Sequence, residues 1–374
     1  MRFNISKHTL LQVLNDVAHG LSYKTPMPVL TGIKIDAFMD SLTFTTSNRE
    51  ISVQVKLEKN DNFEIEEDGT CVVPGKYFLE IAKKIEEDKI NFVLFEESTI
   101  KITTEKTDFT LVALDKDAFP VISFSKIGEP ITIKGNVLKK AIRQTNFAAG
   151  VSEARMILTG VCFEIKNKDL DIIATDSYRL AKKHIELDSE YNYTKINIPN
   201  KALDELEKIL TDTDDELEMY LISNKALIFY KGISFITRLI EGNFPDTSAL
   251  FPKEELTKLT FKKSELLATV DRVALFTNMD SSNIVKVVIK ANKSVQIASS
   301  NNEIGRVIEE VIPLNEPNNN NFQTAFSAKY FIEALKSFEG NLIDIKFTGE
   351  IKPFVITSDK EDGLIQLILP VRIF

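Results

Sequence analysis

Asp176 and Arg179 are the residues whose types and spacing most suggest chemistry. They stand in the stretch from Ile172 to Ala181, which has the pattern of a buried strand, a polar turn and a second strand. In principle the carboxylate could serve a hydrolase, with the arginine clamping an anion. In a tight turn, however, an aspartate more often braces the backbone, and such an arginine more often pairs with a neighbouring carboxylate. We therefore favour a structural role for both.

The rest of the sequence offers little support for catalysis. It contains no P-loop, no Gly-x-Gly-x-x-Gly after a strand, no Gly-x-Ser-x-Gly and no His-Glu-x-x-His. Cys71 and Cys162 lie far apart on apolar strand patterns, and the three histidines cannot complete a zinc site at any usual spacing. We expect both cysteines to be small core residues, and we expect no metal, no cofactor and no catalytic residue.

Length and composition indicate a multidomain globular protein. A chain of 374 residues is too long for one comfortable core, and its 43% hydrophobic and 27% charged residues are ordinary for a folded protein. No signal peptide or membrane-spanning run is evident, so we expect a cytoplasmic protein without membrane contact. The formal net charge of −9 argues against indiscriminate attraction to nucleic acid, although it leaves room for a local basic surface.

A threefold internal repeat organises the elements that must position these residues. Short alternating strands at Phe3, Ile131 and Leu259 start at even spacing, and each precedes a helical pattern with one apolar face. In each copy, paired strands, a polar tip, a second helix and three further strands follow. The stretch 174–181 thus has counterparts in 45–51 and 298–304.

The ends of the copies suggest where the domains divide. Phe119-Pro120 and Phe244-Pro245 close the first two copies, and the third ends freely at Leu369-Pro370-Val371-Arg372. We predict three domains, at 1–125, 126–250 and 251–374. The fold class is α+β, with two helices packed on antiparallel sheets in each domain. Such a chain forms a half-ring whose two sheet edges invite head-to-tail dimerisation.

The repeat, the turn from Thr175 to Ala181, the Phe244-Pro245-Asp246 exit and the Leu369–Arg372 end together resemble the bacterial DNA polymerase III beta subunit, the sliding clamp. The resemblance covers the whole chain. It implies a homodimeric ring that encircles double-stranded DNA without sequence preference. It also implies partners, namely the replicative polymerase, the clamp loader and repair proteins, which bind through short apolar motifs.

The resemblance implies a peptide-binding groove between the second and third domains. Its residues, matched one by one, are Leu158, Thr175, Ser177, Tyr178, Arg179, Leu180, Pro245, Leu250, Leu367, Leu369, Val371 and Arg372. Apolar side chains from distant segments could form such a concave patch, although any one leucine could equally be core. The first and third tips lack the Tyr-Arg-Leu sequence, so we expect one such groove per chain.

The DNA-facing surface is predicted in two ways. The helix carrying Lys134, Lys139, Lys140 and Arg143 places basic residues opposite its apolar face, although it could be an ordinary solvated face. The resemblance adds Lys24, Lys76, Ser152, Arg155 and Lys201. Lys24 stands where the family often has an arginine, and Ser152 replaces a longer polar side chain, so these two contacts depart from the family pattern.

The resemblance also implies the subunit junction. It pairs the 109–114 strand of one chain with the third domain of the other, so that Phe109 and Leu111 pack against Leu275 and Phe276. Two other functions remain open on the sequence. One is a peptide-binding repeat scaffold that never encircles DNA, and the other is a hydrolase using Asp176 and Arg179.

Overall fold

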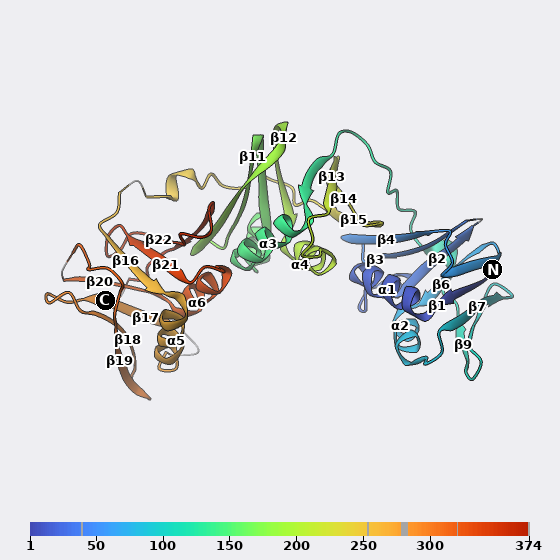
Figure 1. The fold of residues 1–374 in the computed structure, drawn as a ribbon, viewed down its shortest axis with the longest axis horizontal. Helices are drawn as coiled ribbons and strands as arrows, with labels where there is room; N and C mark the ends of the chain where they lie inside the picture. The colour runs from blue at the N-terminus through green and yellow to red at the C-terminus, as the bar shows by residue number, and fades with distance from the viewer. Residues whose placement is uncertain (39, 253, 278–282, 320, 373–374) are drawn as a thin grey trace. The chain divides into compact units, whose positions relative to one another are not determined.

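The computed structural model describes residues 1–38, 40–252, 254–277, 283–319 and 321–372 (Figure 1). Its contacts divide the chain into two compact units. The first unit contains residues 1–139 and 201–239, and the second contains residues 140–200 and 240–374. The chain passes from one unit to the other within α3 (Gly135–Thr145), at the start of α4 (Asn200–Ile209) and between Leu239 and Ile240.

Two antiparallel sheets form the first unit. The smaller has the strand order β5 (Phe63–Glu67), β1 (Arg2–Ser6), β7 (Lys89–Phe95), β8 (Thr99–Thr103) and β9 (Asp108–Val112). The larger has the order β10 (Ile131–Lys134), β13 (Glu216–Ile222), β14 (Lys225–Tyr230), β15 (Ile233–Arg238), β4 (Ile51–Glu58), β3 (Ser41–Ser47), β2 (Gly32–Phe38) and β6 (Gly69–Pro74).

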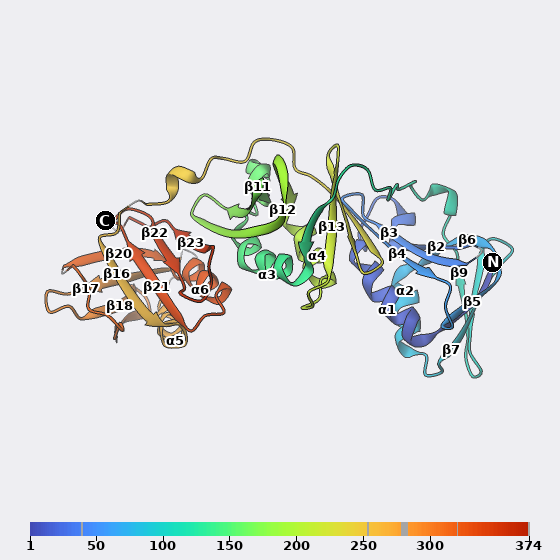
Figure 2. The same ribbon diagram turned by 45° about the horizontal axis from the view of Figure 1, so that its top comes forward.

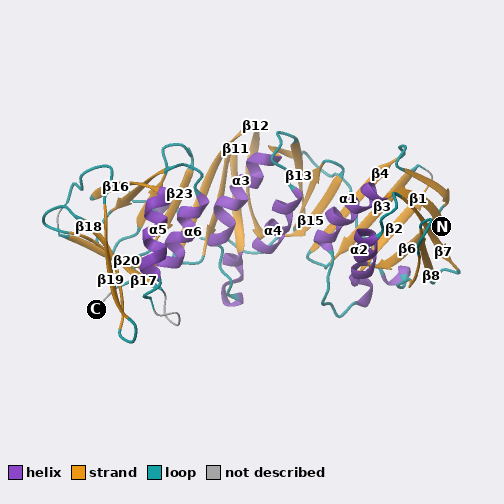
Figure 3. Ribbon diagram, turned by 60° about the horizontal axis from the view of Figure 1, so that its bottom comes forward, coloured by secondary structure: helices purple, strands orange, loops and turns teal. Residues whose placement is uncertain are grey.

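Two helices of the first unit, α1 (Lys7–Val17) and α2 (Gly75–Lys84), lie side by side on these strands (Figure 3). The Ser6 hydroxyl accepts a hydrogen bond from the Thr9 amide and thereby caps α1. Apolar residues at helical spacing then turn one face of α1 into the core, as the sequence predicts: Leu10, Val13, Leu14 and Val17.

The second unit repeats this plan (Figure 2). One sheet has the order β11 (Gly160–Thr175), β12 (Arg179–Pro199), β23 (Leu364–Ile368), β22 (Phe354–Thr357), β21 (Leu342–Phe347) and β16 (Thr257–Lys262). The other has the order β19 (Gly305–Val311), β18 (Val295–Asn301), β17 (Ile284–Ile289) and β20 (Phe322–Ser327). The helices α5 (Lys263–Ala274) and α6 (Ala328–Ser337) pack against each other and on these strands.

Each unit contains the same junction between consecutive copies of the repeat. In the first unit β15 pairs with β4, and in the second β23 pairs with β12, in both cases antiparallel. Because all the pairings between described strands are antiparallel and helices pack on the sheets, the α+β prediction is confirmed.

The three polar tips have the same internal brace, as their sequence correspondence predicts. In each tip the side-chain oxygen of one residue accepts hydrogen bonds from the amides two and three residues later. The bracing residues are Asn48, Asp176 and Asn301. The repeat therefore extends to the turn chemistry and not only to the order of elements.

The two cysteines occupy the core positions expected for them. Both are free and buried, and burial raises the pKa of Cys71 and of Cys162 to about 12. Neither thiol is therefore a reactive group in the folded protein. Across the described ranges, no helix is both long and apolar enough to cross a membrane.

Candidate functional site

Asp176 braces the turn between β11 and β12 in the second unit. Its Oδ1 atom accepts hydrogen bonds from the amides of Tyr178, at 2.9 Å, and Arg179, at 3.1 Å. Its Oδ2 atom accepts a third from Arg179 Nε at 3.0 Å. Ser177 has a φ of 80°, in the left-handed region that such tight turns use. The preference for bracing over catalysis at Asp176 is thus confirmed, because both carboxylate oxygens are engaged within the turn.

Arg179 lies behind this turn, with only 8% of its surface exposed. Besides Asp176, its guanidinium donates to Glu333 on α6 and, at 2.6 Å, to the carbonyl of Phe147. The guanidinium also stacks on the Tyr330 ring, 4.4 Å from its centroid. The prediction that Arg179 belongs to the groove stays a prediction. Its donors are used inside the protein, and it fixes the turn to α6.

A buried apolar cluster lies beside the turn and brings together several of the predicted groove residues. Leu158, at the end of a short 3₁₀ segment (Glu153–Thr159), joins Leu180 on β12 and Leu367 on β23. Leu180 and Leu367 are opposite each other in the ladder. Four residues not foreseen as groove residues complete the cluster: Cys162, Ile173, Phe244 and Val355.

The rim of this cluster is apolar and open to solvent. Tyr178 is 64% exposed and Leu250 is 44% exposed. Met156, which the sequence analysis missed, is 61% exposed. These residues are close along the chain to Leu180, Phe251 and Ile157, which belong to the cluster or pack against it, and together they are a candidate binding surface. Nothing in the sequence around Met156 distinguishes it from a core residue, since its exposure is set by the irregular 3₁₀ segment.

The C-terminal tail is fastened to the same turn. After β23 the amide of Leu369 donates to the Tyr178 carbonyl at 2.9 Å, and the amide of Val371 donates to the Ala325 carbonyl on β20 at 2.7 Å. Leu369 and Val371 are half-buried, and Arg372 is exposed. The tail is thus hydrogen-bonded first to the turn and then to β20 of the other sheet.

The remaining predicted groove residues have simpler roles. The Thr175 hydroxyl donates to the Arg179 carbonyl at 2.6 Å and so closes the turn. Ser177 accepts a hydrogen bond from Arg155 Nη1 at 2.8 Å, and Pro245 is exposed on the linker after Phe244. Arg155, predicted to face DNA, is therefore held at the tip beside the groove.

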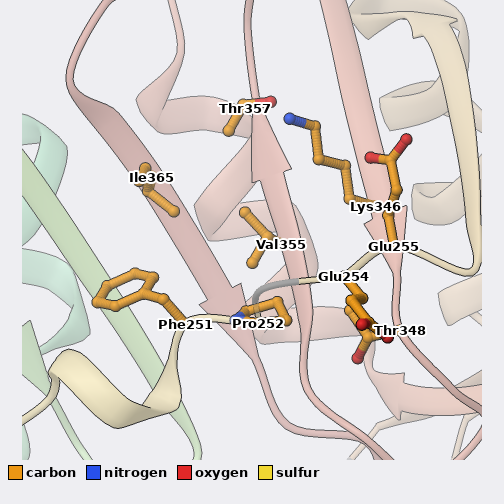
Figure 4. A pocket seen from close by; sticks show the side chains of 9 residues that line it. All are labelled: Phe251, Pro252, Glu254, Glu255, Lys346, Thr348, Val355, Thr357 and Ile365. Carbon is orange, nitrogen blue, oxygen red and sulfur yellow. The ribbon is translucent and has the colours of Figure 1, made fainter.

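A pocket of about 390 Å³ adjoins the cluster (Figure 4). Figure 4 shows Phe251 and Pro252 from the linker beside Val355 on β22 and Ile365 on β23. Val355 belongs to the cluster, and Phe251 and Ile365 pack against it. The apolar surface therefore continues past Leu367 along the outer face of the sheet. No sequence pattern indicates this extension, because Ile365 and Val355 look like ordinary strand residues.

The predicted DNA-facing residues fall into two groups. Lys139 is paired with Asp212 at 3.2 Å, and Lys140 is paired with Glu339 at 2.5 Å and with Glu361 at 3.6 Å. Both lysines are therefore paired with carboxylates of their own units, and their predicted contact with DNA stays a prediction. The others present exposed side chains: Lys24, Lys76, Arg143, Ser152, Arg155 and Lys201.

The predicted junction residues lie near sheet edges. Phe109 and Leu111 share one face of β9 and are half-buried. In the second unit Leu275 ends α5 with 74% of its surface exposed, and Phe276 next to it is half-buried.

Comparison with known proteins gives one consistent result over the whole chain. Sequence models of the DNA polymerase III beta subunit match at residues 1–123 (N-terminal domain), 132–246 (central domain) and 248–372 (C-terminal domain). The "Beta sliding clamp" of Staphylococcus epidermidis is 36% identical over 378 residues and covers 100% of both chains.

Solved structures agree with the sequence comparison. The DNA polymerase sliding clamp of Bacillus subtilis superposes with a TM-score of 0.95 at 35% identity, covering 100% of both chains. The DNA polymerase III beta chain of Streptococcus pneumoniae has a TM-score of 0.95 at 30% identity, again over 100% of both chains.

Proposed function

Because the chain belongs to the DNA polymerase III beta subunit family of sliding clamps, we propose that two copies close head to tail into a ring around duplex DNA. The ring is a processivity factor, a cytoplasmic accessory subunit and not an enzyme. It tethers the replicative polymerase, the clamp loader and repair proteins through the groove of the second unit. The main support for a ring is the strand pairing that each unit already contains between consecutive copies of the repeat, β4 with β15 and β12 with β23.

If the same junction is repeated between copies, two sheet edges remain that could pair with each other, β9 and β19. By position in the repeat, β9 corresponds to β15 and β23, and β19 corresponds to β4 and β12. Among the described strands, each of these two edges pairs on one side only, β9 with β8 and β19 with β18. Addition of β9 of one copy to β19 of another would satisfy both edges in the manner of the internal junctions.

The internal junctions also support a particular register for the closing one. In the first unit Val53 lies opposite Phe235. The ladders within each copy make Phe109 the counterpart of Phe235 and Val307 the counterpart of Val53. In the closing junction Phe109 of one copy therefore lies opposite Val307 of the other.

The chemistry of the two edges suits this register. Phe109 and Leu111 present one apolar face, and Val307 packs against the core cluster of the second unit. On the other face the register places Thr110 opposite Arg306, with Asp108 diagonal to that arginine. Leu275 becomes accessible to the partner copy, because α5 packs against β19.

The groove is suited to a short apolar peptide. Its floor of Leu158, Leu180 and Leu367 is less than 8% exposed, while its rim at Tyr178 remains open. Each leucine or phenylalanine of a partner that is buried there contributes about 1.5–3 kcal/mol. Two such side chains would give the weak affinity that suits a transient interaction between the clamp and a partner protein.

The ring holds DNA through phosphate contacts and does not recognise its base sequence. The net charge of −9 disfavours a tight grip on the phosphates, and Lys139 and Lys140 already have carboxylate partners. Lys24 and Lys76 in the first unit are the clearest candidates for phosphate contacts, since both are exposed. Few phosphate contacts allow sliding and give a shallow dependence of retention on salt.

A topological assay tests the proposal. The protein is loaded on a nicked circular plasmid, and the amount bound is measured before and after a single restriction cut. Retention on the circle and loss after linearisation are expected, because only a closed ring depends on the absence of free ends. A peptide-binding scaffold that merely adheres to DNA would be retained equally on both forms, and that result would refute encirclement.

A further inference from the structure

The first unit contains a cavity at the position that corresponds to the groove of the second. It has a volume of about 300 Å³ and lies beside the tip at Asn48. Its floor is formed by Ser47, Ser52 and Ile236, which are 2%, 8% and 6% exposed. The Ser47 and Ser52 hydroxyls are hydrogen-bonded to each other at 2.9 Å.

The correspondence between the two sites is close at the level of individual bonds. Ser52 is opposite Ile236 in the β4 and β15 ladder, as Leu180 is opposite Leu367 in the β12 and β23 ladder. The same backbone hydrogen bond recurs in both sites, at the residue two positions after Ile236 and the residue two positions after Leu367. The amide of Arg238 donates to the Glu50 carbonyl at 3.0 Å, and that of Leu369 to the Tyr178 carbonyl at 2.9 Å. The linker after Pro120 lines one site, and the linker after Pro245 flanks the other.

The chemistry of the two sites differs. Where the groove has Ser177, Leu180 and Leu369, this cavity has Arg49, Ser52 and Arg238. Lys225 also lines it, directly opposite Arg238 in the β14 and β15 ladder. In the described part of the chain none of the three cations has an ion-pair partner. Like charges facing each other across a ladder repel, and an anion between them would relieve the repulsion.

The cavity is also partly apolar. Met27 and Ile236 line it, together with Val121, which is fully exposed on the linker. An occupant that matches it combines carboxylates for the cations with an apolar side chain for this wall. The cations outnumber the single lining acid, Glu50, by two. Charge complementarity therefore selects an acidic occupant.

We propose that this cavity, here called the acidic-peptide site, binds an acidic and partly apolar peptide segment of a partner protein. Part of the argument rests on the proposed function, because it treats the corresponding groove as a peptide site. A small anion would leave the apolar wall unused. Duplex DNA is disfavoured because its phosphates would leave the apolar wall of Met27, Val121 and Ile236 without a partner.

The test uses the full-length protein immobilised through a tag and two pools of labelled octapeptides. One pool has aspartate fixed at two positions and leucine at a third, with the rest randomised. The matched pool has asparagine in place of aspartate. The wild-type protein is expected to retain about tenfold more of the acidic pool, with the excess falling as salt is raised.

Three variants locate the binding. The double variant R49Q/R238Q should abolish the acidic excess. The control K89Q/K101Q removes two exposed charges from β7 and β8 and should retain the full acidic excess. Tyr178→Ala, in the proposed groove of the second unit, should also retain the full acidic excess. Equal unfolding midpoints establish that the variants are folded.

The inference fails if wild type retains the two pools equally, or if the excess survives R49Q with R238Q. It also fails if millimolar sulfate displaces all of the excess, which would indicate an anion site without peptide recognition. Loss of the excess in Tyr178→Ala would place acidic peptides in the second unit, so that the inference fails and the proposed groove stands. One further outcome separates the two proposals. If the protein retains the acidic excess but binds no apolar peptide at the groove around Tyr178, the acidic-peptide site is supported and the proposed groove is refuted.

Discussion

Replacement of Arg179 by methionine tests how the candidate groove is held in shape. The substitution keeps most of the side-chain volume and removes the guanidinium, so that Asp176 and Glu333 lose their shared partner and the Phe147 carbonyl loses a donor. Removing one member of a fully buried ion pair costs about 3–5 kcal/mol. Glu333 keeps 33% side-chain exposure, so water recovers part of that loss. We expect a cost of about 3 kcal/mol.

The cost is concentrated in the second unit and should be visible in two assays. For a cooperative unit of this size, about 3 kcal/mol lowers the unfolding midpoint by about 6–12 °C in calorimetry. The turn should also loosen at Tyr178, so that an apolar partner peptide binds at least about tenfold more weakly. A matched control is Arg2→Met, which removes an exposed arginine paired with Glu66 at 3.7 Å. A midpoint for Arg179→Met that equals the control would refute the assigned role.

Single contacts elsewhere in the chain can be tested in the same way. Phe109→Asp should convert the dimer to monomers in sedimentation, because a carboxylate opposite an apolar partner is desolvated without compensation; a dimer that persists at micromolar concentration removes Phe109 from the junction. Cys71 and Cys162 should resist iodoacetamide at pH 8 until the protein is unfolded, since their pKa values of about 12 leave almost no thiolate; rapid labelling of the native protein contradicts this. Lys76→Gln should weaken retention on circular DNA at low salt and make its dependence on salt shallower than Lys140→Gln does, because Lys140 is already paired with Glu339 and Glu361; equal effects would contradict the division of the basic residues.

Local patterns made much of the fold predictable. The buried face of α1 follows from apolar spacing. The three tips follow from the recurrence of an Asn or Asp at the same position after a strand, which is a signal within a few residues of chain. Turn chemistry and periodicity are local properties, so a sequence without any alignment is enough to read them.

The features that the sequence did not reveal depend on distant partners. The burial of Arg179 requires Glu333, 154 residues away. The neutralisation of Lys140 requires Glu339, 199 residues away. In the same way, nothing in the local sequence of Arg49 shows that Lys225 and Arg238 line the same cavity. A residue's type constrains what it can do, but its partners are set by how strands from different copies pair.

The central claim is the closing junction between two copies, and engineered cysteines at Phe109 and Val307 test it most directly. Under mild oxidation, the F109C and V307C double variant should form disulfides at both junctions and run at twice the chain mass of 42.2 kDa. A circular plasmid should then retain the covalent ring under denaturing conditions. Failure to cross-link, or faster cross-linking when the second cysteine is placed at Ile308 instead of Val307, would contradict the proposed junction.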